Sequence, residues 1–564
     1  MIQENFIKIY EKSFKKNWEL PALTDYSKGT TFSFADVAKE IARIHILFEE
    51  CQIRRGDKIA LIGKDSARWC IVYMAAVTYG AIIVPILQDF SPNDVHHIIN
   101  HSESVFLFVS DRIWDTLEEE MIEDVRGVFS LSDFRCLHQR DGESIQKLLK
   151  GMDEKMAEKY PDGFGKDDIE YAELDNDKVV LLNYTSGTTG FSKGVMLTGN
   201  NLAGNVMYGI ELGVLYRGER ELCFLPLAHA YSCAFNFLVP MAVGAHVYLL
   251  GKVPSPKILL KAFEEVKPNP VSYTHLRAHL ILTVPLILEK IYKKMILPQL
   301  SKTTMKVALN IPLLDSRIYA QIRKKLVDAF GGRFREVIVG GAAMNEEVTN
   351  FLYKIKFPFT IGYGMTECGP LISYDHNDEY VPGSCGQILK GIMKVRIDSE
   401  DPYNKVGEIQ VSGENVMKGY YKNEEATSKV FTEDGWLRTG DLGTIDADNR
   451  IYIRGRSKTM ILGASGQNIY PEEIESKLNN LPFVMESIII EKNGKLVGLV
   501  YPDYDTVDST GISHEDLPII MEQNRIELNK LLAPYEAVSA LQLYPTEFEK
   551  TPKKSIKRYL YSNY

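Results

Sequence analysis

Helical and strand periodicities alternate along the first part of the chain. Ser33 can cap a helix with Asp36 three residues on, and apolar residues then recur at helical spacing, at Val37, Ile41, Ile44 and Leu47. Residues 55–62 run from a polar turn into a short apolar stretch, which predicts a buried strand. Helices that alternate with such strands are typical of a parallel sheet covered by helices, so we predict an α/β layer structure.

Two longer uncharged stretches, residues 69–87 and 230–251, are long enough on paper to span a bilayer. Gly80 and Pro85 divide the first stretch into a helix and a strand, and a proline and a glycine interrupt the second. These breaks favour buried helix–turn–strand units over transmembrane spans. The N-terminal residues show no basic region followed by an apolar one, so we expect no secretion signal.

The pattern changes twice further along the chain. Residues 110–176 are more polar and predict a peripheral helical excursion of the large domain. Beyond residue 456, Pro471 opens a short helix, and Asn493-Gly494 lies between two apolar runs, which is a hairpin signal. We therefore predict a separate, small α+β domain at the C-terminal end.

Composition narrows the class of protein. A chain of 564 residues is too long for one ordinary core, so we expect roughly two to four domains. The formal net charge of −10 argues against a nucleic-acid partner. Seven scattered cysteines, none at metal-ligand spacing, indicate reduced thiols in a cytoplasm. His96, His97 and His101 share a helix-like segment, and we interpret them as a solvated or capping face rather than a metal site.

A run of glycines and small hydroxyl residues follows the apolar stretch 179–182. It comprises Thr185, Ser186, Gly187, Thr188, Thr189 and Gly190. Backbone N–H groups in such a loop can converge on one anion, and the hydroxyls and Lys193 add donors and positive charge for a polyphosphate. No glycine directly precedes Lys193, so this is not the Gly-x-x-x-x-Gly-Lys-Ser/Thr loop. Taken alone, such a run is more often a flexible connection than a phosphate-binding loop, and the lysine and the preceding strand narrow these odds without reversing them.

A second glycine-rich turn and the end of a strand carry further candidate ligand chemistry. Gly341 and Ala342 follow a strand predicted at 337–339, where small residues let a ligand approach the backbone. The turn at 361–367 offers an aromatic face for a base, a hydroxyl for a phosphate and a carboxylate for Mg²⁺. The residues concerned are Tyr363, Gly364, Thr366 and Glu367. A structural turn is the alternative interpretation.

Two single residues complete the candidates. Asp441 could chelate the two vicinal hydroxyls of a ribose, although an aspartate in a turn often has only a structural role. His229 ends an apolar run, a setting in which a lone histidine is usually a satisfied core residue.

Taken together and in this order, these motifs resemble the adenylate-forming superfamily of acyl-CoA synthetases, firefly luciferase and peptide-synthetase adenylation domains. The matches run from about Thr31 to Arg558, and within the superfamily the chain is most similar to bacterial long-chain fatty acid–CoA ligases. The resemblance implies a large N-terminal domain of layered α/β subdomains with a β-barrel-like part over residues 1–455. It also implies a hinge at 456–458 and a small, mobile α+β domain over 459–564.

The resemblance also implies a role for each candidate residue. Thr185 to Gly190 and Lys193 would cradle the β and γ phosphates of ATP, and Thr366 would touch the α phosphate. Adenine contacts are expected from Gly341, Ala342, Tyr363 and Gly364. Glu367 would bind Mg²⁺, and Asp441 and Arg456 would bind the ribose. His229 would border the acyl pocket or contact the substrate carboxylate, and Lys458 would be the domain hinge.

The chain departs from the family pattern in three places. Phe191-Ser192 stands before Lys193, where the family usually has a proline. Ser555 occupies the position of the family's C-terminal adenylation lysine, and the adjacent Lys554 is the candidate replacement. Residues 270–279 interrupt a place where the family runs almost directly into a strand, as an insertion loop or a sequence error, and we assign no role to the histidines within them.

The implied function is ATP-dependent activation of a fatty acid to an acyl-adenylate, followed by transfer to coenzyme A. No acidic residue lies within 231–242, which disfavours an amino acid as the substrate. Two alternatives stay open: a ligase that loads a carrier protein instead of coenzyme A, and a non-catalytic protein that binds ATP or an acyl group. We expect a cytoplasmic protein, and weak association with the inner face of the membrane would suit an insoluble substrate.

Overall fold

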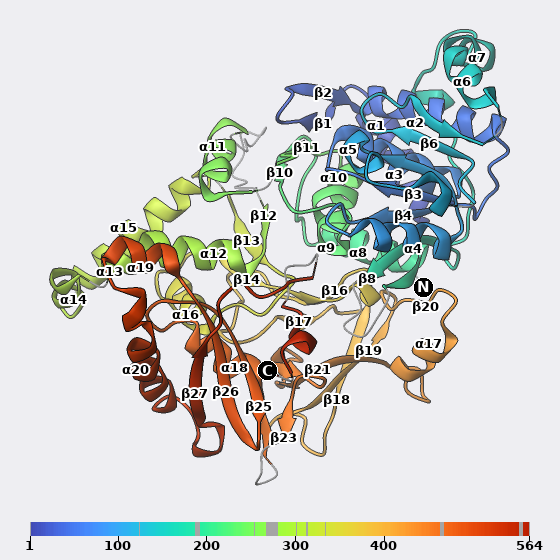
Figure 1. Cartoon of the computed structure of the whole chain (residues 1–564). Coiled ribbons are helices and arrows are strands. Elements are labelled where there is room, and N and C mark those ends of the chain that lie inside the picture. The colour runs from blue at the N-terminus through green and yellow to red at the C-terminus, as the bar shows by residue number, and fades with distance from the viewer. Residues whose placement is uncertain are drawn as a thin grey trace.

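The computed structural model describes residues 2–122, 124–140, 142–185, 192–252, 254–266, 280–300, 302–311, 314–332, 334–462, 467–551, 556–562 and 564. Figure 1 shows a large N-terminal body, coloured blue to light orange, and a smaller C-terminal part in orange and red.

An eight-stranded sheet forms the centre of the N-terminal body, in the order β20-β9-β8-β4-β3-β5-β6-β7. Its inner strands β8, β4, β3, β5 and β6 are parallel, and β7, β9 and β20 add antiparallel edges. The strands are β3 Lys58–Ile62, β4 Ile82–Ile86, β5 Ser104–Val109, β6 Gly127–Ser130, β7 Cys136–Gln139, β8 Val179–Thr185, β9 Lys193–Thr198 and β20 Gly419–Tyr420. The predicted parallel α/β layer is thus confirmed.

Helices surround this sheet, and the two long apolar stretches form buried units. The helices of this part are α1 Phe6–Asn17, α2 Phe34–Glu50, α3 Ala67–Tyr79, α4 Pro92–Ser102, α5 Asp111–Trp114, α6 Ser144–Lys150, α7 Met152–Lys159 and α8 Gly199–Glu211. The predicted capping box of α2 forms, because Ser33 and Asp36 exchange hydrogen bonds. In the part of the chain that the structure describes, no helix combines the length and apolar character needed to cross a membrane.

Two smaller sheets stand beside the first. One has the order β10-β11-β1-β2, with β1 Pro21–Asp25, β2 Thr30–Ser33, β10 Arg220–Cys223 and β11 His246–Leu249. The other is parallel, with β12 Leu280–Thr283, β13 Glu336–Val339 and β14 Phe359–Ile361. The helices here are α9 Ala230–Ser232, α10 Val239–Val243, α11 Pro256–Val266, α12 Pro285–Ile291, α13 Leu297–Leu300, α14 Thr303–Leu309, α15 Leu314–Ala329 and α16 Glu346–Lys354. A π-helix, Cys233–Leu238, joins α9 to α10.

Short antiparallel strands form the barrel-like part. They are β15 Tyr363–Gly364, β16 Leu371–Tyr374, β17 Gln387–Ile388, β18 Met393–Asp398, β19 Gly407–Gly413, β21 Leu437–Ile445 and β22 Ile451–Arg456, with helix α17 Glu424–Val430. This part leads directly into the C-terminal region, because β22 ends at Arg456.

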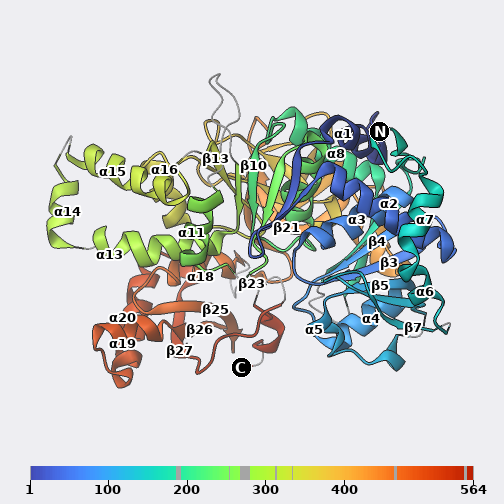
Figure 2. The same cartoon turned by 90° about the horizontal axis from the view of Figure 1, so that it is seen from above.

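The C-terminal part has its own hydrophobic clusters, around Ile474 and Val500 and around Ile488 and Phe548. Its elements are β23 Ile461–Leu462, β24 Asn468–Ile469, α18 Pro471–Leu478, β25 Val484–Lys492, β26 Lys495–Pro502, α19 Tyr504–Thr510, α20 Leu517–Asn529 and β27 Val538–Leu543. The hairpin predicted at Asn493-Gly494 joins β25 to β26. Figures 1 and 2 both show β25–β27 well apart from the eight-stranded sheet, which agrees with the predicted α+β unit.

Two expectations from the sequence are wrong. Residues 110–176 are not purely a helical excursion, since β6 and β7 extend the central sheet there. The histidines of α4 are not simply a solvated face: His96 is buried and accepts a hydrogen bond from the backbone N–H of Glu118 at 3.0 Å. In both cases side chains from other elements supply burial that the local polarity did not reveal.

Candidate active site

The glycine-rich loop begins and ends on paired strands. Thr185, the last residue of β8, lies opposite Lys193, the first residue of β9. The Lys193 ammonium group lies 4.9 Å from the centre of the Tyr420 ring, within the range of a cation–π contact. Strand pairing therefore fixes the base of the loop, and Tyr420 orients its lysine. Ser186, Gly187, Thr188, Thr189 and Gly190 lie outside the described residues.

Tyr420 also connects Lys193 to the second glycine-rich turn. Its hydroxyl donates to Glu367 Oε1 at 2.9 Å, and the backbone N–H of Met417 donates to the Glu367 carbonyl at 2.8 Å. Burial, together with the nearby Glu367 carboxylate, raises the pKa of Tyr420, so the phenol stays protonated and acts as a donor. One tyrosine thus brings a cation and a carboxylate to the same place.

The turn that carries Glu367 is held by backbone contacts at close range. Thr366 and Glu367 lie in a short 3₁₀ helix, Thr366–Cys368, and the N–H of Met365 donates to the Pro370 carbonyl at 2.9 Å. A side chain at Gly364 would overlap the Pro370 carbonyl, so the turn requires glycine there. The Leu371 N–H donates to Asn205 Oδ1 at 2.9 Å, which ties the turn to helix α8.

Asp441 and Tyr363 form a buried pair beside this turn. The Tyr363 hydroxyl donates to Asp441 Oδ2 at 2.6 Å, and Arg456 Nε lies 3.0 Å from Asp441 Oδ1. Burial raises the pKa of Asp441, while Arg456 and the Tyr363 hydroxyl oppose that rise and Glu367 adds to it. Tyr363 itself is buried, with its hydroxyl engaged.

Gly341 and Ala342 lie at the carboxyl end of β13 in the parallel sheet β12–β14. Gly341 and Ala342 are exposed just after β13, and Gly341 has a φ of +89°, a conformation that favours glycine. The neighbouring Gly340 packs against Tyr231, whose hydroxyl donates to the Ile338 carbonyl at 3.1 Å. His229 is the N-cap of α9, two residues before Tyr231.

Half-buried His229 is held in place by two elements of the central sheet. Asn183 on β8 donates to the Ala228 carbonyl at 3.3 Å, and Asp65, after β3, accepts from the Leu227 N–H at 3.0 Å. Burial raises the pKa of Asp65 to about 7. The backbone just before His229 is therefore fixed to β8 and to the segment that follows β3.

Comparison with known proteins identifies the family. The family model "AMP-binding enzyme" matches residues 10–421. The chain belongs to the AMP-binding enzyme family. It is an adenylate-forming acid–CoA ligase, of the class that uses ATP with Mg²⁺ and coenzyme A as co-substrate.

Individual relatives agree over nearly the whole length. The AMP-binding enzyme is 26% identical to the long-chain-fatty-acid–CoA ligase FadD15 of Mycobacterium bovis, over 94% of this chain and 90% of that protein. It is 28% identical to the 4-coumarate–CoA ligase CCL1 of Humulus lupulus, over 88% and 84% of the two chains. Its fold is similar to that of ATP-bound MatB from Rhodopseudomonas palustris, with a TM-score of 0.74, 21% identity and 99% of both chains covered.

The C-terminal part of this AMP-binding enzyme starts from an exposed linker. Arg456 and Lys458 are exposed, and the N–H of Ser457 donates to the Gly440 carbonyl at 2.9 Å. Lys554 and Ser555 lie outside the described residues, as does the stretch 270–279. Just beyond them, Arg558 forms a hydrogen-bonded ion pair with Glu475 of α18. This pair fixes the described residues that follow the candidate lysine to α18.

Sequence reasoning missed three residues that organise the site: Tyr420, Asn205 and Asp65. The first belongs to Gly419-Tyr-Tyr-Lys422, which has no spacing diagnostic of a ligand site. The other two act through single hydrogen bonds to distant backbone groups, and no local pattern marks them.

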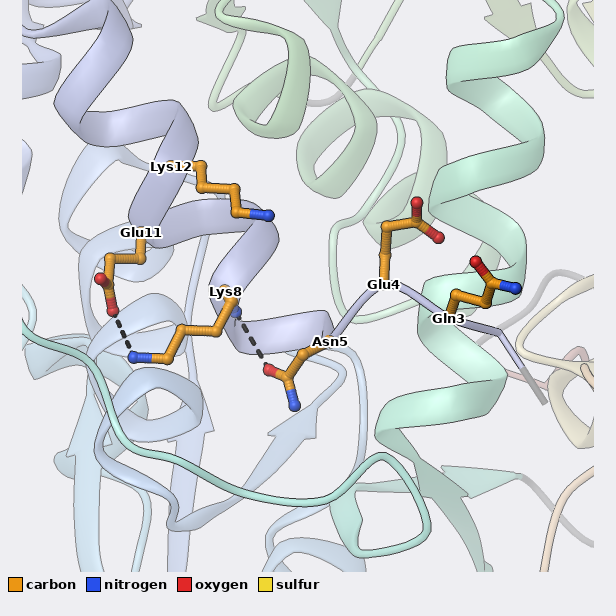
Figure 3. Close-up of a pocket in the computed structure, with 6 residues that line it drawn as sticks. All are labelled: Gln3, Glu4, Asn5, Lys8, Glu11 and Lys12. Carbon is orange, nitrogen blue, oxygen red and sulfur yellow. Dashed lines mark hydrogen bonds and ion pairs between the residues drawn. The ribbon is translucent and has the colours of Figure 1, made fainter.

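A surface hollow of about 530 Å³ lies elsewhere on the AMP-binding enzyme, at the start of α1. Figure 3 shows its lining, in which Lys8 pairs with Glu11 at 2.7 Å and Asn5 caps the helix. It shares no residue with the site, and we assign it no ligand.

Proposed function

We propose that the enzyme activates a fatty acid with ATP, releasing pyrophosphate, and then transfers the acyl group from the adenylate to coenzyme A. The observation that carries this proposal is the contact of Tyr420 with both Lys193 and Glu367, together with the buried Asp441, which pairs with the exposed Arg456. Such a set offers a cation for phosphates and a carboxylate for a metal at one end, and a ribose-binding carboxylate at the other.

Each residue of this set has a role in the first half-reaction. Lys193 neutralises charge on the phosphates as pyrophosphate leaves, and the Thr366 hydroxyl donates to the α phosphate. Asp441 accepts from the ribose hydroxyls while Arg456 holds its second oxygen. Gly341 and Ala342 present backbone to the adenine, and Tyr363, with Gly364, forms its floor. Mg²⁺ prefers oxygen ligands such as carboxylates, so the Glu367 carboxylate would hold this metal ion. The ion would neutralise negative charge on the phosphates.

The acid-binding surface lies along the helical segment that begins after His229. Tyr231 and Phe235 have ring centres 6.2 Å apart, and Tyr231 packs on Gly340 at the end of β13. Long-chain fatty acid ligases among the relatives support an aliphatic acid. The 4-coumarate ligase and the two aromatic rings make an aromatic acid the competing candidate. Weak association with a membrane surface would suit an insoluble acid and belongs to the same proposal.

The domain bounds 1–455, 456–458 and 459–564 are also part of this proposal. Separate hydrophobic clusters and the exposed residues Arg456 and Lys458 support a C-terminal domain that rotates about Lys458 between the half-reactions. That domain would supply Lys554 for adenylation and then withdraw it.

The test is AMP release from ATP, with palmitate or 4-coumarate, each with and without coenzyme A. We expect AMP to accumulate with palmitate only when coenzyme A is present. AMP-forming turnover with a carrier protein and not with coenzyme A would identify a carrier-protein loader. Turnover with 4-coumarate alone would replace the fatty acid by an aromatic acid, and ATP binding without any AMP would indicate a non-catalytic protein.

The site assignment has its own variants. We expect Lys193→Ala and Glu367→Ala each to lower AMP release about 100-fold, because each removes charge stabilisation at the phosphates. Lys429→Ala and Glu425→Ala serve as matched controls, since these residues form an exposed pair on α17. Turnover that survives both site variants would show that the phosphates bind elsewhere.

A further inference from the structure

The C-terminal end of helix α4 lies behind the nucleotide site and touches residues adjacent to it. His97 and His101 stack with ring centres 5.5 Å apart, and Glu103 ends the helix with a φ of +57°. None of the three belongs to the binding set described above, yet His101 and Glu103 each contact a tyrosine next to a member of that set.

The first contact joins His101 to the start of the glycine-rich loop. His101 Nδ1 lies 2.7 Å from the hydroxyl oxygen of Tyr184, the residue before Thr185. The Tyr184 ring fills the space over Gly194, since a Cβ there would lie 3.0 Å from Tyr184 Cζ. Tyr184 and Gly194 are also cross-strand partners. The hydrogen bond to His101 therefore fixes the Tyr184 ring, which packs against both strands, β8 and β9, that flank the glycine-rich loop.

The second contact joins Glu103 to the segment that carries Tyr420. The Tyr421 hydroxyl donates to Glu103 Oε2 at 2.8 Å, and the Tyr421 N–H donates to the Gly194 carbonyl at 2.8 Å. Lys422 pairs with Glu103 at 2.7 Å and holds the pKa of that carboxyl at about 2, with help from the Tyr421 hydroxyl. Glu103 is therefore charged at physiological pH and acts as a fixed acceptor.

The two contacts meet at His101. Its ring lies edge-on to both Tyr184 and Tyr421, with ring centres 5.8 Å away in each case. Burial, with His97 and Lys422 nearby, holds the pKa of His101 below its usual value. The neutral imidazole can accept the Tyr184 proton at Nδ1.

We propose that His101 and Glu103 are positioning residues for the phosphates of ATP. They hold Tyr184 and Tyr421, and through these the backbone of Gly194 and the neighbouring Lys193 and Tyr420. Because Tyr420 contacts both Lys193 and Glu367, a shift of one tyrosine would displace the cation and the carboxylate together. This inference rests on the proposed function, since it takes the phosphates to bind at Lys193.

The test uses His101→Ala, Tyr184→Phe, the double variant and His101→Asn, whose amide can meet the Tyr184 hydroxyl. The Kd of Mg·ATP is measured by calorimetry, and the KM values for ATP and for the acid by ATP–pyrophosphate exchange. We expect each single variant to weaken ATP binding about fivefold, the effect of one lost hydrogen bond, and to leave the KM for the acid unchanged. The double variant should bind ATP no more weakly than the single variants do. His101→Asn should recover most of the affinity for ATP.

Glu103 is tested by Glu103→Gln, which keeps an acceptor for Tyr421 but removes the charge, and by Glu103→Ala, which removes both. We expect the alanine variant to bind ATP more weakly than the glutamine variant. His514→Ala is the control, because His514 forms an exposed pair with Asp508 in the C-terminal part.

The outcomes separate this inference from the function on which it rests. A wild-type enzyme that turns over, with variants whose Kd and KM for ATP are unchanged, would overturn the positioning role alone. Equal losses for ATP and acid, accompanied by a lower Tm, would also overturn it, because they would show a merely structural role. Failure of the wild type to bind ATP would overturn both, whereas binding without turnover leaves the Kd comparison as the decisive measurement.

Discussion

Two buried carboxyl groups of this enzyme differ in the hydrogen bonds and ion pairs that offset their loss of hydration. Asp441 receives a hydrogen bond from Tyr363 and an ion pair from Arg456. Glu221, on β10, receives only the Asn236 amide at 2.5 Å, and its other carboxyl oxygen is buried with no hydrogen-bond partner among the described residues. Burial therefore raises the pKa of Glu221 to about 8, and Asn236 opposes the rise only in part.

Because of the buried Glu221 carboxyl, we expect the free energy of unfolding to fall as the pH rises. The unfolded chain releases this proton near pH 4.5, whereas the folded protein keeps it up to about pH 8. Between these values the folded state binds more protons, so the free energy of unfolding falls with rising pH, by at most about 1.4 kcal/mol per unit. We expect Glu221→Gln to flatten the decline of Tm between pH 5 and 8. Glu425→Gln, at an exposed site, should leave the slope unaltered, and a slope that Glu221→Gln does not change would contradict the assignment.

At the scale of elements, the second glycine-rich turn shows how two similar residues can have different constraints. Gly362 and Gly364 flank Tyr363, and the sequence offers no reason to distinguish them. A Cβ on Gly362 would meet its nearest neighbour, the Ser373 carbonyl, at an ordinary 3.6 Å. A Cβ on Gly364 would overlap the Pro370 carbonyl, which accepts the Met365 N–H and so closes the turn. Only the second glycine is required by the fold.

This pair gives a matched prediction. Gly364→Ala should displace Glu367 and lower AMP release at least tenfold, because the backbone must move to admit the methyl group. Gly362→Ala should retain activity within about twofold, since its methyl group makes only ordinary contacts. Both variants are assayed for AMP release with saturating ATP and acid, and circular dichroism shows whether each has folded. Equal effects of the two substitutions would contradict the packing argument.

At the scale of the whole molecule, the large body caps the end of a helix in the C-terminal part. Asn345 Nδ2 donates to the Ser476 carbonyl at 3.0 Å and to Asn480 Oδ1 at 2.7 Å, and Lys293 donates to the Asn479 carbonyl at 2.6 Å. Carbonyl groups at the end of α18, which have no partner within the helix, are thus satisfied across the two parts. This contact favours the observed arrangement of the parts.

Loss of that contact should loosen the C-terminal part without unfolding it. Asn345→Asp keeps the oxygen that caps α16 through the N–H groups of Glu347 and Val348 but loses the donor to α18. Together with Lys293→Met, it should speed trypsin cleavage at the exposed linker residues Arg456 and Lys458 several-fold. Lys290→Met, on the exposed side of α12, is the matched control. An unchanged cleavage rate would show that this contact does not hold the two parts together.

The sequence by itself determined the features that depend on neighbours along the chain. The capping box of Ser33 and Asp36, the proline at the start of α18 and the hairpin at Asn493-Gly494 all formed as predicted, because each involves residues only a few positions apart. The ordered motifs likewise indicated the family, which the comparisons confirmed. Local periodicity also predicted the parallel sheet, although it missed β6 and β7, whose burial comes from other strands.

Only the tertiary structure decided how the site is assembled. Lys193 and Glu367 meet through Tyr420, and Tyr363 meets Asp441, across separations that no local pattern encodes. The same holds for the contact of His101 with Tyr184, which turned an apparently solvated histidine into a proposed support of the glycine-rich loop. The physical reason is that hydrogen bonds between distant segments depend on which strands pair and which surfaces become buried, and these follow from packing of the whole chain.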